Sequence, residues 1–288
     1  MVTTAPRTEV MRHSSKFGEW EMVTRDPAAH LRAYVTKYEG YVVMNTTFAR
    51  RLEIPSSDVV LIINFGPKYR VSGPGNAAGA SEHHSFTAGL IDSYVIVEAT
   101  GLSSGIQVNF TPIGAHLFLD MPMSEVTNRT VDFDDVLGGA ARRIVAQLED
   151  TPDWEARFDI LDAFIAARVT RAAEPSPGVA WAWRRLHETD GQLGIGALAD
   201  EIGWSRKHLI TRFREQIGLP PKTMARIVRF GRVIRQLDGV AEVRWAQIAA
   251  GCGYYDQAHF NRDFREFTGG TPTEFLLRRI PDGGGLLG

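Results

Sequence analysis

The spacing of hydrophobic and polar positions divides the chain into two regions. From Trp20 to about Phe110, short runs rich in Val, Ile, Tyr and Thr alternate with turn residues, which predicts β-strands. The clearest runs are residues 34–48, 58–66, 93–99 and 105–110, with a turn expected at 101–104. Several short strands with regular turns favour an antiparallel barrel or sandwich. Beyond Phe110 the apolar residues recur mostly at helical spacing.

Three helices are predicted directly after these strands. The first follows Thr111-Pro112, a capping residue and a proline at the first helical position. The second covers residues 134–148 and is weakened by two glycines, and the third follows Thr151-Pro152. The third carries large apolar residues from Trp154 to Val169, which we expect to pack against the barrel or a partner subunit. The charged, proline-broken stretch 171–177 predicts a linker.

One helical pattern occurs twice in the last third of the chain, at residues 195–218 and 245–269. Each copy has a short helical segment, a glycine where the chain must turn, and a polar residue that caps a second helix. The glycines are Gly203 and Gly253, and the capping residues are Ser205 and Asp256. Aligning Ser205 with Tyr255 gives a repeat of 50 residues. Helix, tight turn and helix together make a helix-turn-helix unit, and two copies are more specific than one.

The second helix of each copy has an apolar face and a polar face. The apolar faces, predicted to be core, are Leu209, Phe213 and Ile217 in the first copy and Phe260, Phe264 and Phe267 in the second. Arg and Lys bind guanine edges or phosphates, Asn binds adenine, and Thr and Ala methyl groups contact thymine. A solvated helix face is the alternative for any single Arg, but two equivalent faces in a repeat favour DNA binding. The candidate DNA-binding residues are Arg206, Lys207, Ile210, Thr211, Arg214, Gln257, Ala258, Asn261, Arg262 and Arg265.

A connecting helix is predicted at residues 222–237, after Pro220-Pro221. It has a buried apolar stripe and a basic face formed by Arg226, Arg229 and Arg232. We expect this helix to hold the two motifs at a fixed separation, about one DNA turn apart.

Charge is unevenly distributed, although the chain carries a net charge of only −2. Residues 181–280 contain 16 Lys and Arg and 11 Asp and Glu, a net charge of +5. Residues 1–180 contain 16 and 22, a net charge of −6. Positive charge therefore gathers around the repeated motif, as phosphate binding requires.

The single cysteine, Cys252, permits no disulfide within the chain. The sequence also has no signal-peptide pattern and no apolar run long enough to span a bilayer. These features predict a cytoplasmic protein that does not bind membranes. We interpret Cys252 as a small packed residue rather than a redox sensor.

The two motifs resemble the tandem DNA-binding domain of AraC/XylS-type transcription regulators. The second copy carries the more specific match, IAAGCGYYDQAHFNRDFREFTGGTPTEF, including Phe260, the glycine before Thr271-Pro272 and Phe275. Tyr255 departs from the family pattern, in which small polar residues are common there, and Ala258 is a weak base-contacting residue. The resemblance covers roughly the last third of the chain and implies binding to double-stranded DNA, with RNA polymerase as a further partner. It also implies a β-barrel sensor domain that binds a small-molecule effector, forms a homodimer, or does both.

Together these observations predict an α+β protein with two domains. We expect a flexible N-terminus at 1–18 and, at 19–171, a mostly antiparallel, cupin-like β barrel with flanking helices. A linker at 172–178 then leads to an all-α DNA-binding domain at 179–280, with two helix-turn-helix motifs joined by a linker helix, and a flexible tail at 281–288. The predicted function is a sequence-specific transcription regulator, activator or repressor, which is not an enzyme and needs no cofactor.

Two alternatives stay open at the level of sequence. Glu82, His83, His84 and His116 suggest a cupin-like metal-dependent enzyme with a helical appendage, since cupin barrels bind metals through His and Glu. Adjacent strand residues point to opposite faces, so this spacing argues against a metal site. The second alternative is an interaction module that reaches DNA only through a partner.

Overall fold

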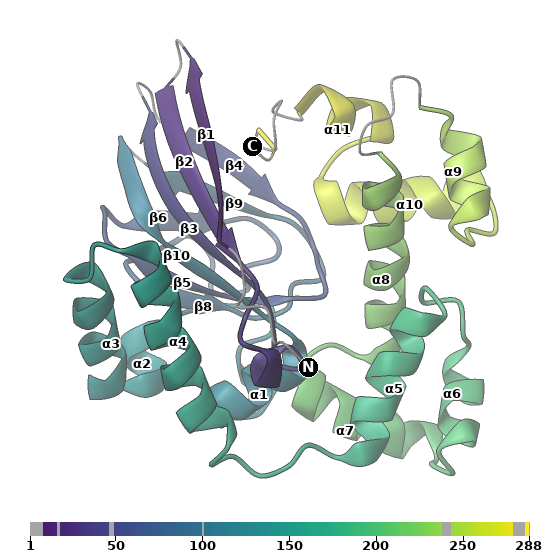
Figure 1. Ribbon diagram of the computed structural model, residues 1–288. Helices are drawn as coiled ribbons and strands as arrows, with labels where there is room; N and C mark the ends of the chain where they lie inside the picture. The colour runs from purple at the N-terminus through teal and green to yellow at the C-terminus, as the bar shows by residue number, and fades with distance from the viewer. Residues whose placement is uncertain are drawn as a thin grey trace, which may run out of the picture.

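Figure 1 shows the computed structural model, in which a sheet-rich half lies beside a helical half. The structure describes residues 8–15, 18–45, 49–99, 101–237, 243–278 and 286–287. The two-domain α+β architecture predicted from the sequence is confirmed.

Two antiparallel sheets make up most of the N-terminal half. Within the described residues, one sheet has seven strands in the order β1-β2-β3-β10-β5-β8-β11, and the other has four in the order β4-β9-β6-β7. The larger sheet consists of β1 (Glu9–Ser15), β2 (Gly18–Arg25), β3 (Val35–Asn45), β5 (Val59–Asn64), β8 (Phe86–Ala88), β10 (Leu102–Phe110) and β11 (Thr130–Asp132). The smaller consists of β4 (Ala49–Glu53), β6 (Tyr69–Ser72), β7 (Ser81–His83) and β9 (Val95–Ala99). No strand ladder joins the two sheets within the described strands, so the predicted antiparallel barrel takes the form of a barrel-like sandwich.

The N-terminal strand corrects the prediction of a flexible segment at 1–18. Residues 1–7 and 16–17 lie outside the described part, but Glu9–Ser15 forms β1, which pairs with β2 along its whole length. Arg12 forms a salt bridge of 2.6 Å with Glu21 on β2. β1 lies at the sheet edge, and its apolar residues Val10 and Met11 are adjacent and exposed, so it has none of the apolar alternation that identified the other strands. The turn predicted at 101–104 is also shorter, because β10 begins at Leu102.

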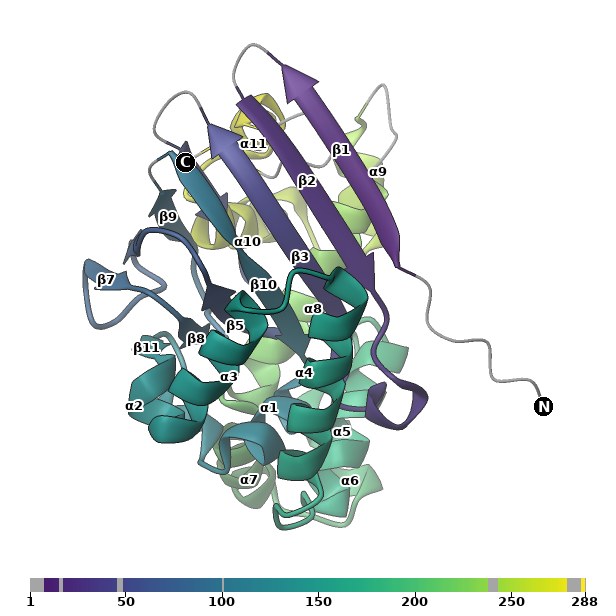
Figure 2. The ribbon, with the colours of Figure 1, turned by 60° about the vertical axis from the view of Figure 1, so that its left-hand side comes forward.

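Helices cover the outer face of the larger sheet (Figure 2). The helical segments of this half are η1 (Ala29–Leu31), α1 (Pro112–Leu119), η2 (Met123–Glu125), α2 (Phe133–Leu137), α3 (Gly139–Glu149) and α4 (Trp154–Val169). The Trp154 ring of α4 lies against Gly40, where an added Cβ would come within 2.3 Å of it. Tyr38 stacks on Phe158 with 5.6 Å between ring centroids. Arg25, which is 3 % exposed, forms a 2.6 Å salt bridge with Asp162 of α4.

Two of the predicted helix boundaries are corrected by the structure. The predicted helix 134–148 divides into α2 and α3 at Gly138, whose φ of +54° suits a glycine. Asp153, not Thr151, caps α4, because its side chain accepts a hydrogen bond from the Ala156 amide. The Thr111 cap of α1 is confirmed, with the hydroxyl accepting from the Gly114 amide at 3.0 Å.

The C-terminal half is helical throughout its described residues. It consists of α5 (Pro177–Glu188), α6 (Ile195–Glu201), α7 (Arg206–Ile217), α8 (Pro221–Gln236), α9 (Trp245–Gly251), α10 (Gln257–Thr268) and α11 (Pro272–Arg278). The six apolar residues predicted as core faces of α7 and α10 are confirmed as core, since each is at most 1 % exposed. The described helices include none long and apolar enough to cross a membrane.

One apolar core continues from the sheets into the helical half. It passes through α1, which packs against both α4 and α7. Of the tail predicted to be flexible at 281–288, the structure describes Leu286 and Leu287, and the rest lies outside the described residues. Leu287 bridges Arg51 of β4. The two halves are therefore packed together rather than simply linked.

Candidate nucleic-acid interface

Both helix-turn-helix units form as predicted, with helices α6 and α7 in the first and α9 and α10 in the second. The Ser205 hydroxyl accepts a hydrogen bond from the His208 amide at 3.2 Å, and the Asp256 carboxylate accepts one from the His259 amide at 2.7 Å. The turn glycines Gly203 and Gly253 have φ values of +69° and +77°, which non-glycine residues rarely adopt. Local hydrogen bonds and glycine geometry thus fix where α7 and α10 begin.

Helix α8 is the connecting helix predicted from the sequence. It lies in the chain between the first helix-turn-helix unit, which ends with α7, and the second, which ends with α10. It contains 16 residues, so it is about 24 Å long at 1.5 Å per residue. Figure 1 shows α7 before the start of α8 and α10 crossing beside α8, where Arg226 and Phe230 of α8 contact α10. A continuous helix is stiff, so the spacing between α7 and α10 is set by the fold.

The candidate DNA-binding residues lie on the outer faces of α7 and α10. The side chains are exposed on both helices except that of Asn261, which is partly buried. The two faces match at an offset of 51 residues, which superposes Lys207 on Ala258, Thr211 on Arg262 and Arg214 on Arg265.

The cations on these faces differ in how far they are engaged within the chain. The side chains of Lys207, Arg214, Arg262 and Arg265 make no hydrogen bond or salt bridge to another residue that the structure describes, so their charge is available to an anionic partner. The Arg206 guanidinium, by contrast, lies against Gly196 of α6, where an added Cβ would come within 2.5 Å of it.

The basic face predicted for the connecting helix is not an exposed surface. Arg226 binds Asp263 and Glu266 of α10 at 2.7 and 2.6 Å. Arg229 donates to the Gly191 carbonyl at 2.9 Å, and Arg232 forms a 2.8 Å salt bridge with Asp190. These arginines join helices within the half, which corrects the interpretation of that face.

Cys252 lies in the turn after α9 and is fully buried, which confirms the prediction of a packed residue. Burial raises the pKa of its thiol. A buried thiol with a raised pKa is poorly suited to redox sensing.

The sheet-rich half contacts the C-terminal ends of both α7 and α10. The Ser93 hydroxyl donates to the Glu266 carbonyl at 2.9 Å, and the Tyr94 ring lies against Gly269, the left-handed cap of α10. At the end of α7, Gly218 lies against Thr127, whose hydroxyl would be 2.6 Å from an added Cβ. The N-terminal ends of α7 and α10, which begin the candidate faces, are not part of these contacts.

A layer of polar side chains lies between the two sheets, and sequence reasoning did not identify it. Its members, here called the inter-sheet polar layer, are Glu39, Tyr41, Arg51, Glu53, Tyr69, Gln107 and Asn109. Gly40 faces α4, so its neighbours Glu39 and Tyr41 point the other way, toward the smaller sheet. There the Tyr69 hydroxyl donates to the Tyr41 hydroxyl at 3.1 Å. The alternation of polar residues along β3 was the available signal, but only the pairing of strands shows which face is interior.

The inter-sheet polar layer reaches solvent at Glu53, whereas Tyr69 and Asn109 are buried. The Glu53 side chain is exposed, although β4 turns it toward the larger sheet. Gln107 donates to Asn109 at 2.8 Å within the same layer. This arrangement can accept a small polar molecule between the sheets.

The residues considered for a metal site do not converge. His83 contacts Ser81 at 2.7 Å and Asp132 at 2.8 Å, and the His116 ring contacts the Met121 carbonyl at 2.8 Å. Glu82 and His84 are exposed on the surface. Among the described residues, no group of three or more His, Cys, Asp or Glu side chains is placed to hold a metal ion.

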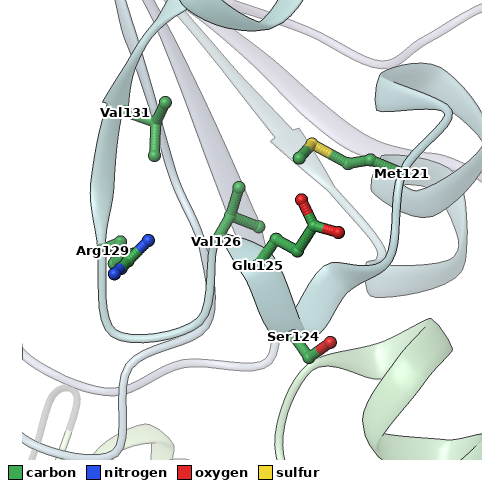
Figure 3. Close-up of a pocket in the computed structure, with 6 residues that line it drawn as sticks. All are labelled: Met121, Ser124, Glu125, Val126, Arg129 and Val131. Atoms are coloured by element: carbon green, nitrogen blue, oxygen red, sulfur yellow. The ribbon is translucent and has the colours of Figure 1, made fainter.

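A surface hollow of about 470 Å³ lies beside η2, which packs against α7. Figure 3 shows its lining residues, Met121, Ser124, Glu125, Val126, Arg129 and Val131. Ser124, Glu125 and Arg129 are exposed, so the hollow is shallow and its charged groups remain in contact with water.

The comparison with family models concerns both halves of the chain. A model described as "Helix-turn-helix domain" matches residues 198–278, which contain most of α6 and all of α7 to α11. Residues 198–278 form an AraC-type helix-turn-helix domain. This domain is the DNA-binding part of a transcription regulator. A model described as a domain of unknown function, DUF6597, matches residues 23–132, and no curated protein matches the chain significantly.

Solved structures offer more distant likenesses to this chain. Apo ToxT from Vibrio cholerae is 12 % identical with a TM-score of 0.47, covering 83 % of this chain and 97 % of that one. The C-terminal domain of AraT, a response regulator from Geobacillus stearothermophilus, is 20 % identical with a TM-score of 0.35, covering 39 % and 93 %. Oxalate decarboxylase from Lactobacillus farciminis is 13 % identical with a TM-score of 0.26, covering 58 % and 45 %. At TM-scores below 0.5 none of these establishes a shared ligand or activity.

Proposed function

We propose that this chain contacts a specific DNA duplex with the outer faces of both α7 and α10, each in its own major-groove segment. The observation that carries the proposal is the pair of matching exposed faces, each with cations that make no salt bridge within the described chain. A cation held without an internal partner is suited to bind a phosphate or a guanine edge. The base-contacting residues are Lys207, Thr211, Asn261 and Arg262, and the phosphate-contacting ones are Arg206, Arg214 and Arg265.

The length of α8 supports contact with successive grooves on one side of the duplex. One helical turn of DNA is about 34 Å, and α8 with the short segments at its ends is of that order. The outer faces of α7 and α10 carry different residues, so a single chain should prefer an asymmetric site. Protection footprints should show two patches about 10 base pairs apart for each chain.

The test of base contact compares Arg262→Ala with the wild-type chain on its selected duplex and on random DNA. A lost bidentate base contact costs about 1–3 kcal/mol, so binding to the selected duplex should weaken roughly 5- to 150-fold. The matched control is Arg184→Ala, because Arg184 is also an exposed cation but lies on α5, where it pairs with Glu188, and belongs to neither face. The control should bind the selected duplex like the wild type.

Two results would contradict this assignment. Equal loss on selected and random DNA would make Arg262 a phosphate contact rather than a base contact. One footprint patch per chain, unchanged when Arg262 and Arg265 are both replaced by Ala, would show that α10 does not bind DNA.

The N-terminal half is proposed to bind a small effector in the inter-sheet polar layer. Polar side chains that line the space between the sheets can hydrogen-bond a ligand rich in donors and acceptors. The carboxylates of Glu39 and Glu53 and the hydroxyls of Tyr41 and Tyr69 favour a polar molecule over a long-chain fatty acid. In a thermal-shift panel of sugars, amines, amino acids and fatty acids, a polar member should stabilise the protein. Glu53→Gln should abolish that shift without changing DNA binding in the absence of ligand.

The domain limits and partners predicted from the sequence extend this proposal. The proposed sensor domain covers the predicted residues 19–171 together with β1, which pairs with β2. The proposed DNA-binding domain, predicted at 179–280, begins with α5 at Pro177, so the linker predicted at 172–178 is shorter. RNA polymerase and a second copy of the chain are proposed as partners, and sedimentation at micromolar concentration would test the homodimer. The apolar residues of α4 give the dimer no support, because Phe158, Leu161 and Ile165 are buried within the chain.

A further inference from the structure

The turn of the second helix-turn-helix unit contains one residue more than the turn of the first. The first helices of the two units start 50 residues apart, at Ile195 and Trp245, and the turn glycines are also 50 apart. The capping residues Ser205 and Asp256, however, are 51 apart. The repeat of 50 that aligns Ser205 with Tyr255 therefore holds only as far as the turn.

Aromatic packing identifies the additional residue as Tyr255. Trp204 packs edge-on against His208 of α7, with 4.5 Å between ring centroids. Tyr254 does the same with His259 of α10, at 5.2 Å. Tyr254 is thus the structural equivalent of Trp204, and Tyr255 has no counterpart in the first unit.

Tyr255 is an exposed aromatic residue on a well-fixed backbone. Its exposure of 93 % is the highest among the large hydrophobic side chains that the structure describes. Immediately before it, Tyr254 is buried and its amide donates to the Ala249 carbonyl at 3.1 Å. Immediately after it, Asp256 caps α10. Tyrosine is enriched at interfaces because its ring is apolar and its hydroxyl polar, so an exposed tyrosine on a fixed backbone is suited to contact a partner.

The location of Tyr255 indicates which partner it contacts. It directly precedes the N-terminal end of α10, where the exposed residues Gln257 and Ala258 begin the proposed DNA-binding face. Figure 1 shows α9 and the start of α10 at the outer edge of the helical half, away from the sheets. In helix-turn-helix proteins the N-terminal residues of the second helix lie closest to the DNA. Tyrosine hydroxyls are among the groups that bind phosphate oxygens there.

We infer that Tyr255 contacts the DNA backbone, its hydroxyl donating to a phosphate at the edge of the groove that α10 enters and its ring packing on the adjacent sugar. This contact rests on the proposed function, because it requires α10 to enter a major groove. The Tyr255 contact gives the second unit a contact to the DNA backbone that the first unit lacks, so the second unit is positioned differently on the duplex.

The test measures binding of full-length variants by fluorescence anisotropy, on the selected duplex and on random DNA, over a range of salt concentrations. Tyr255→Phe removes only the hydroxyl, so binding should weaken about three- to tenfold, which corresponds to the free energy of one hydrogen bond. Tyr255→Ala also removes the ring and should weaken binding further. Both variants should lose affinity equally on the two DNAs, since a phosphate contact carries no base information. The salt dependence should stay unchanged, because a neutral side chain releases no counterion.

Leu277→Ala is the matched control, because Leu277 is 80 % exposed on α11 of the same domain. It should bind like the wild type. Wild-type affinity of both Tyr255 variants, while Arg262→Ala loses affinity, overturns the inference and leaves the proposed function intact. Wild-type affinity of all three would instead show that α10 does not bind DNA, and the proposed function fails with it.

Two further results also overturn the inference. Loss restricted to the selected duplex would make Tyr255 a base contact. Normal DNA binding by Tyr255→Ala, with loss of transcription activation in the presence of RNA polymerase, would place the side chain against a protein. Circular dichroism confirms that each variant is folded, which is expected for a side chain with 93 % exposure.

Discussion

Asp58, at the start of β5, illustrates how its surroundings change the chemistry of a single residue. Burial raises the pKa of its carboxyl to about 6. The Thr36 hydroxyl lowers the pKa by donating a hydrogen bond at 3.4 Å, and the charge of Glu39 raises it. The folded protein therefore binds a proton at Asp58 more tightly than the unfolded chain does. For such a group, stability is highest below the unfolded pKa and falls as the pH rises toward the folded one.

Asp58→Asn should consequently stabilise the protein at neutral pH. The gain should be on the order of 1–3 kcal/mol at pH 7, since the variant no longer ionises a buried carboxyl. The difference in unfolding free energy should grow between about pH 4 and pH 6 and vanish below about pH 4, where both side chains are neutral. Urea unfolding at several pH values measures it, and a gain that is independent of pH would contradict the assignment to ionisation.

At the scale of elements, α8 and α10 are joined by a charged cluster as well as by apolar packing. Asp263 is 1 % exposed, and its carboxylate receives two hydrogen bonds from Arg226, at 3.1 and 2.7 Å. Arg226 also binds both oxygens of Glu266, at 3.0 and 2.6 Å. A buried carboxylate that loses its partner keeps its desolvation cost, so Arg226 determines how firmly α10 is held.

Arg226→Met should therefore destabilise the helical half by about 2–4 kcal/mol in urea unfolding. Adding Asp263→Asn should recover much of this loss, because the unpaired buried charge is then removed. Arg212→Met is the control, since Arg212 forms a partly exposed pair with Glu215 that is worth less than about 1 kcal/mol. Equal effects of the Arg226 and Arg212 variants would mean that the cluster contributes no more than a surface ion pair.

At the scale of the whole molecule, the two halves share one core and meet at both helices of the proposed DNA-binding surface. The sheet-rich half contacts the ends of α7 and α10 through Thr127, Ser93 and Tyr94. The helical half also has its own interior, in which Val179, Phe213 and Phe230 are fully buried. Phe230 packs on Phe264 and Phe267 of α10, so part of this interior is formed by helices of the same half, while the sheet-rich half covers its edge.

A fragment lacking residues 1–173 should fold and bind the selected duplex. Its affinity should stay within about threefold of the full chain, a difference below about 0.7 kcal/mol, because the contacts it loses lie away from the proposed DNA-binding faces. Its melting temperature should be lower than that of the helical half in the full chain, since the surface around Gly218 becomes exposed. Circular dichroism and anisotropy check these outcomes, and an unfolded fragment would show that the sheets complete the domain.

Local features of the sequence determined the elements, their caps and the faces that are buried. Ser205 and Asp256 cap their helices with hydrogen bonds to backbone only three residues away, and Phe260 and Phe264 lie one helical turn apart. Such interactions depend on neighbours along the chain, so a sequence pattern is sufficient to identify them. The polar residues of β1 lacked a pattern of this kind, because a strand at a sheet edge needs no apolar alternation.

Tertiary structure alone decided which of several similar residues are available for binding. Arg226 and Arg262 both lie on the polar faces of amphipathic helices, yet Arg226 is bound by two carboxylates of α10 and Arg262 makes no salt bridge within the described chain. The inter-sheet polar layer also depends on tertiary structure, because Tyr41 and Tyr69 meet only after strands from different sheets are brought face to face. The physical reason is that an ion pair or an interior polar contact depends on residues distant in sequence, and a pattern within one element carries no information about them.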